Sequence, residues 1–383
     1  MSAAFTPMRA KPKSACPIGA AAAARPASVS PWIGTAAAYT PRKPDPRIRW
    51  FLDANEGRPS DRVVAAIGSY LTGASGGVGR YPSFYELEAL LASRWNVDPA
   101  RIVATAGGDD AISRIVAARL APGAKLLVHE PAFEMFGAYA RSRGAETLGL
   151  QWLDGQAFPI DATIEAIERC PSLGLATVVS PSNPTGGFVP VAHALAVADA
   201  CARSGAAFLF DAAYGEFADE DPSRRLVADG SAYVVRSFSK AYGLAGLRIG
   251  YAIAPDAAAA AALRSCGMPY PSSSLAVVAA LAALDDKVGV AAFIAAVRTE
   301  RAALAGRLRD LGARVAGSSA NFVLARVLDP AGLAASMAAD GIAIRSYGAR
   351  PLLSDAVRVS CPGDPVALAA ALLALSRAKE YIG

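Results

Sequence analysis

Apolar runs typical of strands alternate with stretches typical of helices through the middle of this chain. The expected strands are 101–105, 125–129, 147–151, 175–180, 206–211, 232–237 and 249–254. The expected helices between them include 85–95, 111–120, 136–143 and 191–203. This alternation predicts an α/β fold with a mainly parallel, seven-stranded sheet that helices cover on both faces. In such sheets, ligands bind at the carboxyl ends of the strands.

The pattern changes after residue 256. Helices are expected at 258–265, 288–311 and 366–381, and strands at 314–327, 342–346 and 356–360. We therefore expect a large domain at 61–256 and a smaller α+β domain at 257–383, which the segment 45–60 joins.

The segment 1–44 contains no Asp or Glu and combines six basic residues with many Ala, Pro and Ser. This composition cannot build a packed core, so it predicts a disordered arm. Its acid-poor character also resembles a transit peptide, although it lacks an apolar run that ends in a cleavage site.

The overall composition excludes several classes of protein. Hydrophobic residues make up 53% of the chain, but many are alanine, and no stretch approaches the roughly 20 strongly apolar residues of a membrane span. The net charge of +5 comes from scattered basic residues, which disfavours nucleic-acid binding. Five separated cysteines without a CxxC pair and only two histidines indicate no disulfide framework, no metal site and no His-based triad. A cytoplasmic location fits this cysteine usage best.

The most informative segment follows the expected strand 232–237. Ser237 and Ser239 precede Lys240, and Arg248 follows a glycine-containing turn. Hydroxyls and a guanidinium near one loop suit a phosphate, and a desolvated lysine beside them can act as a nucleophilic amine. Lys240 is also the only lysine between Lys125 and Lys287.

Other strand ends carry polar groups of complementary chemistry. Asp211 ends an apolar strand, with Tyr214 three residues later, and a carboxylate there can keep a pyridine nitrogen protonated. Asn183 lies in a rigid loop between prolines, where its amide can donate to a phenolate oxygen. Taken singly, Asp211 also fits a helix N-cap and Lys240 a surface lysine.

Two further strand ends complete the set. Gly108 and Asp109 lie in a Gly-Gly turn that opens a helix, where backbone N–H groups can bind an anion. Phe133 follows the next strand and could stack on a flat ring, although a lone phenylalanine is more often part of the core. Together, these strand ends supply the groups that pyridoxal 5'-phosphate requires.

Two alternatives from other classes are weaker. The glycine cluster 73–79 is compatible with a nucleotide-dependent oxidoreductase, but no strand precedes it, which indicates a loop. A non-catalytic cofactor-binding regulator would require an attached DNA-binding module, and the segment 1–44 is too short and too rich in Ala and Pro to form one.

At this point the chain resembles the fold-type I aminotransferases, and most of all the histidinol-phosphate aminotransferase group. The resemblance runs from about residue 52 to 360. It rests on LDANE at 52–56, RYP at 80–82, GGDD at 107–110, EPAFEM at 130–135, SPSNPTG at 180–186, DAAY at 211–214, SFSK at 237–240 with an arginine at 248, PYP at 269–271 and VRVS at 357–360.

The resemblance implies a role for each predicted cofactor residue. Lys240 looks like the Schiff-base lysine, and Asp211 like the partner of the ring nitrogen. Asn183 and Tyr214 look like ligands of the ring hydroxyl, with Tyr214 also counted as catalytic, and Phe133 like the stacking ring. The residues that resemble the phosphate-binding cup are Gly108, Asp109, Ser237, Ser239 and Arg248.

The resemblance also implies partners and substrates. Tyr81 resembles a tyrosine that reaches the cofactor of a neighbouring subunit, which implies a homodimer with shared sites. Arg358 resembles the arginine that binds the acidic group of the substrate, and Arg345 is a second candidate. Tyr39 resembles a substrate-contacting tyrosine, and Asn183 also belongs to the expected substrate contacts.

Four departures from the family pattern bear on the substrate. Gly-Arg-Pro at 57–59 shortens or alters the usual Asn-Pro continuation after 55–56. The family usually has Glu at the positions of Asp110 and Ala212, and Thr or Ser at the position of Ala132. The best expectation is histidinol phosphate with 2-oxoglutarate, both small molecules. Aromatic or other amino acids, or a decarboxylation like that of threonine-phosphate decarboxylase, remain open alternatives.

Overall fold

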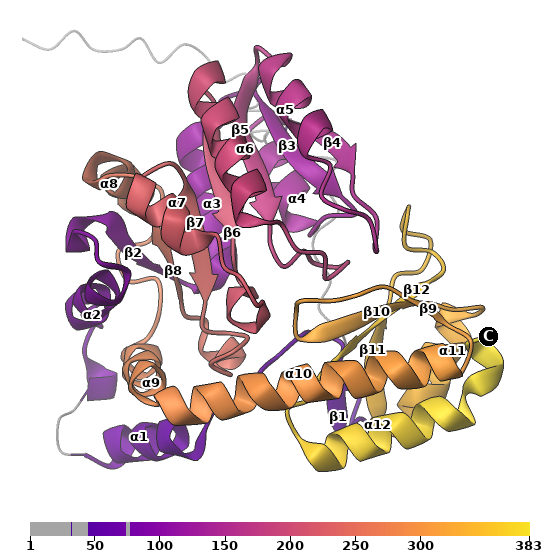
Figure 1. The fold of residues 1–383 in the computed structure, drawn as a ribbon. Coiled ribbons are helices and arrows are strands. Elements are labelled where there is room, and N and C mark those ends of the chain that lie inside the picture. The colour runs from indigo at the N-terminus through magenta and orange to yellow at the C-terminus, as the bar shows by residue number, and fades with distance from the viewer. Residues whose placement is uncertain (1–31, 33–44, 74–76) are drawn as a thin grey trace, which may run out of the picture.

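The computed structural model describes residue 32 and residues 45–73 and 77–383 (Figure 1). The arm expected at 1–44 therefore lies almost entirely outside the described residues.

A seven-stranded sheet forms the larger part of the molecule, and it confirms the predicted α/β fold. Its order is β2-β8-β7-β6-β5-β3-β4, and only β8 runs antiparallel to its neighbours. The strands are β2 (Ile102–Thr105), β3 (Lys125–Glu130), β4 (Glu146–Gln151), β5 (Leu173–Val179), β6 (Ala207–Asp211), β7 (Tyr233–Ser237) and β8 (Gly250–Ile253).

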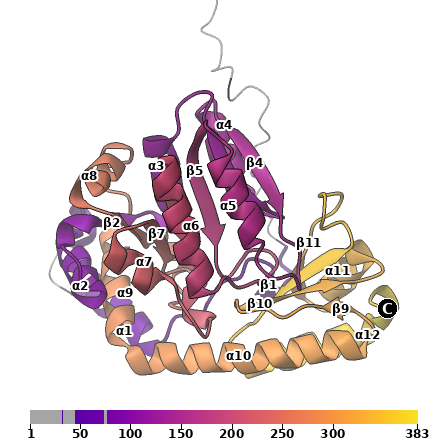
Figure 2. The same cartoon turned by 45° about the horizontal axis from the view of Figure 1, so that its top comes forward.

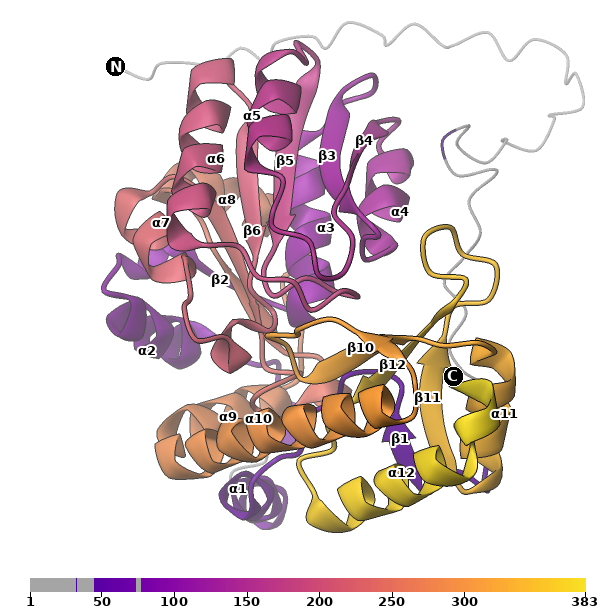
Figure 3. The same ribbon diagram turned by 45° about the vertical axis from the view of Figure 1, so that its right-hand side comes forward.

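Helices cover both faces of this sheet because its central strands are apolar on both sides. One face packs against α2 (Tyr85–Trp95), α5 (Ile160–Glu168), α6 (Val191–Ser204), α7 (Ser223–Asp229) and α9 (Ser274–Asp285). The opposite face packs against α3 (Gly107–Arg119), α4 (Met135–Ser142) and α8 (Ala257–Ser265) (Figure 3). The carboxyl ends of the six parallel strands point toward the rest of the molecule.

A five-stranded sheet lies at that end of the large sheet. Its order is β1-β11-β12-β10-β9, with β1 parallel to β11. The strands are β1 (Trp50–Leu52), β9 (Arg314–Val315), β10 (Phe322–Arg326), β11 (Ile342–Ser346) and β12 (Ala356–Ser360). It packs with α10 (Lys287–Asp310), α11 (Pro330–Ala339) and α12 (Pro365–Arg377), as Figure 2 shows.

The single strand expected at 314–327 is wrong. The segment forms β9 and β10, which pair antiparallel with Arg314 opposite Arg326. The loop between them contains Ser319, whose backbone N–H donates to the carbonyl of Gly186 at 2.9 Å. The loop thus turns away from the small sheet and contacts the large one.

A partly buried arginine also joins the two sheets. Arg326 of β10 lies 2.5 Å from Asp154, which follows β4, and 2.5 Å from Asp355. The side chains of Arg326 and Asp154 are each only 13% exposed, so solvent screens this ion pair less than a surface pair.

Alanine makes up much of the buried surface of helix α9. In α9, four alanines are almost fully buried: Ala276, Ala279, Ala280 and Ala283. Helix α1 (Asp61–Thr72) packs against α9. Among the described residues, none of the helices is both long enough and apolar enough to cross a bilayer.

The segment after β1 lies directly on the turn that follows β7. The N–H of Gly57 donates to the carbonyl of Ser239 at 3.3 Å. A Cβ atom at Gly57 would lie 1.7 Å from the carbonyl oxygen of Lys240, and one at Gly243 would lie 2.2 Å from the backbone of Arg58. Only glycine permits this approach of two backbones.

Gly57→Ala should therefore destabilise the protein by about 2 kcal/mol or more, because the methyl group forces two backbone segments apart. The control is Gly68→Ala in α1, where a Cβ would meet nothing within 4 Å. That change should raise stability by about 0.5–1 kcal/mol through helix propensity. Chemical denaturation of both variants measures the difference, and equal stability of Gly57→Ala and the native protein would contradict the close approach.

Candidate active site

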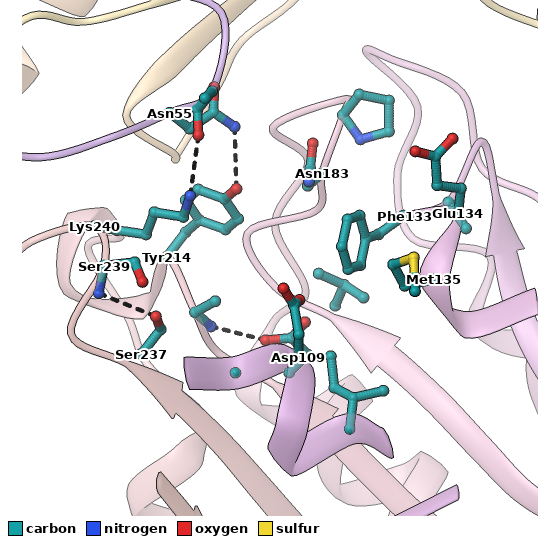
Figure 4. A pocket seen from close by; sticks show the side chains of 18 of the residues that line it. Asn55, Asp109, Phe133, Glu134, Met135, Asn183, Tyr214, Ser237, Ser239 and Lys240 are labelled. Atoms are coloured by element: carbon teal, nitrogen blue, oxygen red, sulfur yellow. Dashed lines mark hydrogen bonds between the residues drawn. The ribbon is translucent and has the colours of Figure 1, made fainter. Parts of the chain in front are cut away.

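A cavity of about 580 Å³ lies where the two sheets meet. Twelve of the residues singled out in the sequence line it: Gly108, Asp109, Phe133, Asn183, Asp211, Tyr214, Ser237, Ser239, Lys240, Arg248, Arg345 and Arg358. Figure 4 shows several of them converging from different elements. The parallel strands of the large sheet bring most of them together because their carboxyl ends share one edge, and Arg345 and Arg358 come from the small sheet.

Lys240 extends into the cavity from the turn after β7. Its Nζ donates a hydrogen bond to the carbonyl of Ala54 at 3.1 Å and lies 5.6 Å from the centre of the Tyr214 ring. The turn itself is closed by a hydrogen bond from the Gly243 N–H to the Lys240 carbonyl. The amine is thus held by backbone and ring, and in the described part of the chain no carboxylate is its direct partner.

Asn55 connects this region to the small sheet. Its Nδ2 donates to the Tyr214 hydroxyl at 3.0 Å, and its Oδ1 accepts from the Ser360 hydroxyl at 2.9 Å (Figure 4). The carbonyl of Asn55 accepts from Asn321 Nδ2, and its N–H donates to Ser360 Oγ. Asn55 has a left-handed backbone with φ 54°, a conformation in which Asn is favoured among non-glycine residues.

Arg358 of β12 also spans the two sheets. Its Nη1 donates to Asn183 Oδ1 at 2.5 Å, and its Nη2 donates to the carbonyl of Asp53 at 2.8 Å. Because Oδ1 of Asn183 faces Arg358, the amide nitrogen of Asn183 remains available as a donor.

Asp211 is the buried carboxylate of the site. It is 6% exposed, and Oδ1 accepts a hydrogen bond from the Ala213 N–H at 3.0 Å. Burial raises the pKa of Asp211 to about 6, despite the nearby charges of Arg236 and Lys240. A cation placed against this carboxylate would lower its pKa again and keep it ionised at neutral pH.

The start of α3 lies at the edge of the cavity. No side chain caps its first turn at Ala106, and Gly108 and Asp109 face the cavity. Arg248 lies beside this turn, with Nη2 3.7 Å from Asp109 and a hydrogen bond to the carbonyl of Ala106. Gly107, with φ +82°, leaves space for that guanidinium, because a Cβ there would lie 2.8 Å from Arg248 Nη2.

Ser237 and Ser239 lie across from this helix start, at the end of β7. The Ser239 N–H donates to Ser237 Oγ at 3.1 Å, which orders the turn. Tyr139 of α4 lines the same side of the cavity, and burial raises the pKa of its hydroxyl to about 12. Tyr139 therefore stays protonated and able to donate.

A cluster of ion pairs around Arg236 connects two elements of the site. Arg236, adjacent to Ser237 in β7, is 5% exposed and contacts Asp221 at 2.5 Å and Glu216 at 2.7 Å. Glu216 is two residues after Tyr214. The cluster thus joins the strand that carries the serines to the turn that carries the tyrosine.

The structure shows where three of the departures from the family pattern lie. Asp110 accepts from the Ala106 N–H and pairs with Arg114 at 2.9 Å, so it stabilises the start of α3. Ala212 is fully buried in the core of the large sheet. Ala132 lines the cavity with Phe133, and its carbonyl accepts from Arg350.

Two predicted site residues remain. Tyr39 lies outside the described residues. Tyr81 is 80% exposed and stacks on Tyr270, with ring centroids 4.4 Å apart. Its expected contact is with another subunit, so its role stays a prediction.

Sequence reasoning assigned no role to several residues of the cavity region. These are Asn55, Glu134, Tyr139, Tyr347, Arg350 and Ser360. Asn55, Glu134 and Ser360 belong to the motifs at 52–56, 130–135 and 357–360, which gave the only available signal. Tyr139, Tyr347 and Arg350 lie outside the motifs, and the pairing of β1, β11 and β12 brings Tyr347, Arg350 and Ser360 to the site.

The chain matches known proteins over most of its length. The model of the family "Aminotransferase class I and II" matches residues 51–375. The histidinol-phosphate aminotransferase of Halorubrum lacusprofundi is 36% identical over 327 residues, covering 83% of this chain and 85% of the relative. That of Ruminiclostridium cellulolyticum is 30% identical and covers 72% of this chain and 76% of the relative.

A solved structure agrees with these relatives. The histidinol-phosphate aminotransferase of Sinorhizobium meliloti, in complex with pyridoxal 5'-phosphate, superposes with a TM-score of 0.78. It is 26% identical, and the match covers 87% of this chain and 91% of that one. Fold, cavity and family match agree, and the chain belongs to the class I and II aminotransferases, enzymes that use pyridoxal 5'-phosphate.

Proposed function

We propose that this protein is a histidinol-phosphate aminotransferase, which transfers the amino group of histidinol phosphate to 2-oxoglutarate. The observation that carries the proposal is the convergence of Lys240, buried Asp211 and the Asn183–Arg358 pair on one cavity. The relatives that bear this name cover most of the chain at 30–36% identity.

The cavity fits pyridoxal 5'-phosphate by the chemistry of its donors. The uncapped start of α3 with Arg248, Ser237 and Ser239 suits the phosphate, since backbone N–H groups, hydroxyls and a guanidinium all donate to it. Asp211 suits the ring nitrogen, because a buried carboxylate with a raised pKa favours a cationic partner. The amide of Asn183 and the hydroxyl of Tyr214 suit the ring hydroxyl, and Phe133 suits the ring face.

Lys240 would serve as the cofactor's point of attachment and then as the proton carrier. When bound, pyridoxal 5'-phosphate supplies a carbonyl carbon that accepts the amino group and a protonated ring that withdraws electrons. Lys240 Nζ, once released as a neutral amine, takes the proton from the α-carbon of the substrate. The Tyr214 ring and the Ala54 carbonyl limit where that nitrogen can lie.

Tyr214 and Arg358 would orient the reacting groups. The hydrogen bond from Asn55 fixes the Tyr214 hydroxyl as an acceptor on one side, which leaves its proton for the cofactor. Arg358 would bind the acidic group of each substrate, and Arg345 lies opposite it in the neighbouring strand.

We further propose a homodimer in the cytoplasm. Tyr81, Tyr85, Met268 and Tyr270 leave large apolar side chains exposed, a surface suited to a second copy of the chain. Tyr81 would then reach the partner's cofactor. The widely separated cysteines fit a reducing compartment.

We also propose the domain division expected from the sequence: a large domain at 61–256, a small one at 257–383, and 45–60 joined to the small one. The pairing of β1 with β11 supports the assignment of 45–60.

The activity test is glutamate formation from histidinol phosphate and 2-oxoglutarate by the protein loaded with pyridoxal 5'-phosphate. We expect turnover with histidinol phosphate to exceed that with phenylalanine or tyrosine. Release of carbon dioxide from a phosphorylated amino acid, without glutamate formation, would instead favour the decarboxylase alternative.

Lys240→Ala should abolish covalent attachment of the cofactor. The native protein, mixed with pyridoxal 5'-phosphate and reduced with borohydride, should carry the cofactor's mass on the peptide that contains Lys240. Lys287→Ala is the control, because Lys287 is an exposed residue at the start of α10. Labelling of Lys240→Ala to the same extent as the control would contradict the assignment.

Asp211→Asn should stabilise the cofactor-free protein while weakening its activity. A folded-state pKa raised from 3.8 to about 6 means that the charged form of Asp211 costs about 3 kcal/mol above pH 6. This cost falls as the pH drops from 6 toward 4, because the folded state binds the proton more tightly than the unfolded state. The variant's advantage in thermal unfolding should therefore be large at pH 8, about half as large at pH 5, and small at pH 4. An advantage that does not change with pH would contradict a raised pKa.

A further inference from the structure

Arg236 and Ser237 are neighbours in β7 that face opposite sides of the large sheet, since side chains alternate along a strand. Ser237 faces the start of α3, where its Cβ lies 3.8 Å from the place that a Cβ at Gly108 would take. Arg236 faces α2, and its guanidinium carbon lies 5.4 Å from the centre of the Trp95 ring. Any effect of this buried charge on the cavity therefore passes through neighbouring residues.

The turn after β6 packs directly on the Arg236 guanidinium. A Cβ atom at Gly215 would lie 2.7 Å from Arg236 Nη1, so a side chain at this position would collide with it. The φ angle of Gly215 is outside the left-handed region, so this contact is what requires glycine. One residue later, Glu216 Oε1 accepts a hydrogen bond from Arg236 Nη2 at 2.7 Å. The two residues that follow Tyr214 are thus both fixed to one guanidinium.

Tyr214 itself is held at its other end by the small sheet. Its hydroxyl accepts from Asn55 Nδ2 at 3.0 Å, and its ring lies beside Lys240, with Nζ 5.6 Å from the ring centre (Figure 4). Because the ring can turn about two side-chain torsions, these contacts alone do not fix the backbone of Tyr214. The contacts of Arg236 with the next two residues supply that second point of attachment.

Stability is a poor explanation for the cluster around Arg236. Asp221 also accepts from Arg236 Nη1 at 2.5 Å, so one buried cation is shared by two carboxylates. Oε2 of Glu216 and Nε of Arg236 are buried without a hydrogen-bond partner among the described residues, which lowers stability. Apolar residues of similar volume often replace a buried ion pair without loss of stability. The cluster is better explained if the position of the Tyr214 turn matters.

We propose that Arg236 and Glu216 are positioning residues, which fix the backbone of Tyr214 so that its hydroxyl reaches the ring hydroxyl of pyridoxal 5'-phosphate. This inference rests on the role proposed for Tyr214, and it does not depend on which amine is the substrate. A hydrogen bond weakens steeply with distance and angle, so a displaced turn would lose the contact even with the tyrosine intact.

The first test measures the dissociation constant of pyridoxal 5'-phosphate in Tyr214→Phe, Gly215→Ala and Glu216→Gln. Tyr214→Phe should weaken binding about tenfold, because a hydrogen bond to a charged oxygen is lost. Gly215→Ala and Glu216→Gln leave the tyrosine in place and should each weaken binding by about threefold or more. The pH at which the visible band of the bound cofactor changes should move in the same direction in all three variants, because all three weaken the same hydrogen bond.

Arg119→Met is the matched control. Arg119 Nε donates to the Tyr233 hydroxyl at 2.7 Å, so it binds the same strand at its opposite end. This variant should keep the cofactor's dissociation constant within about twofold of the native value and leave the pH response of the visible band unchanged.

A double-mutant cycle shows whether the effect passes through Tyr214. Added to Tyr214→Phe, either Gly215→Ala or Glu216→Gln should weaken binding by less than about twofold more, because the hydrogen bond is already absent. Fully additive losses would overturn the proposal, as would native affinity in both single variants. Native affinity in Tyr214→Phe would reject the role of Tyr214 and this inference with it, whereas failure of histidinol phosphate as a substrate would leave these results unchanged.

A paired change separates position from stability. Arg236→Met with Glu216→Met replaces the buried pair by apolar side chains, while Asp221 is partly exposed and keeps its hydrogen bond from the Ser223 N–H. The cofactor-free protein should unfold at or above the native temperature. Its affinity for pyridoxal 5'-phosphate should nevertheless fall about tenfold. Native affinity in this folded variant would show that the cluster does not position Tyr214.

Discussion

The hydrogen bonds of Asn55 are the constraint on which the active site depends. They join the Tyr214 turn of the large sheet to Ser360 and Asn321 of the small sheet through one buried side chain and its backbone. The glycine contact two residues later places the same segment on the Lys240 turn. The positions of the lysine, the tyrosine and the substrate-facing strands are therefore set together, and a shift of this segment would move all three.

The cavity keeps its charges in separate regions. Asp211 lies buried at one side with a carboxylate that favours a cation, and the start of α3 with Arg248 favours an anion. The small sheet adds Arg345, Arg350 and Arg358; within the ranges that the structure describes, Arg345 has no carboxylate partner and the carboxylate beside Arg350 lies 3.9 Å away. Such an arrangement costs stability in the protein alone, and that cost is recovered when ligands of the opposite charge bind.

The large sheet and the residues at its strand ends could be predicted from the sequence, because both depend on local patterns. A run of apolar residues followed by Asp211, Asn183 or Lys240 places the polar group at the carboxyl edge of a parallel sheet. The small sheet was harder to predict, because the sequence of β9 and β10 is compatible with one continuous strand. The turn between them is visible only in the structure, where Ser319 contacts Gly186. Asn55, Tyr347 and Arg350 could not be predicted, because they reach the cavity through the pairing of β1 with β11, some 290 residues apart. The individual site roles, the dimer and the domain limits stay predictions.

The alanine-rich packing of α9 has a consequence for the thermodynamics of the fold. Alanine has no side-chain rotamers to lose, so burying Ala276, Ala279, Ala280 and Ala283 carries almost no side-chain entropy cost. Each of these residues also contributes little apolar area, so the gain depends on how closely the neighbouring backbones approach. The stability of this region therefore depends on close helix contacts, and a larger side chain at any of the four positions would push the neighbouring elements apart.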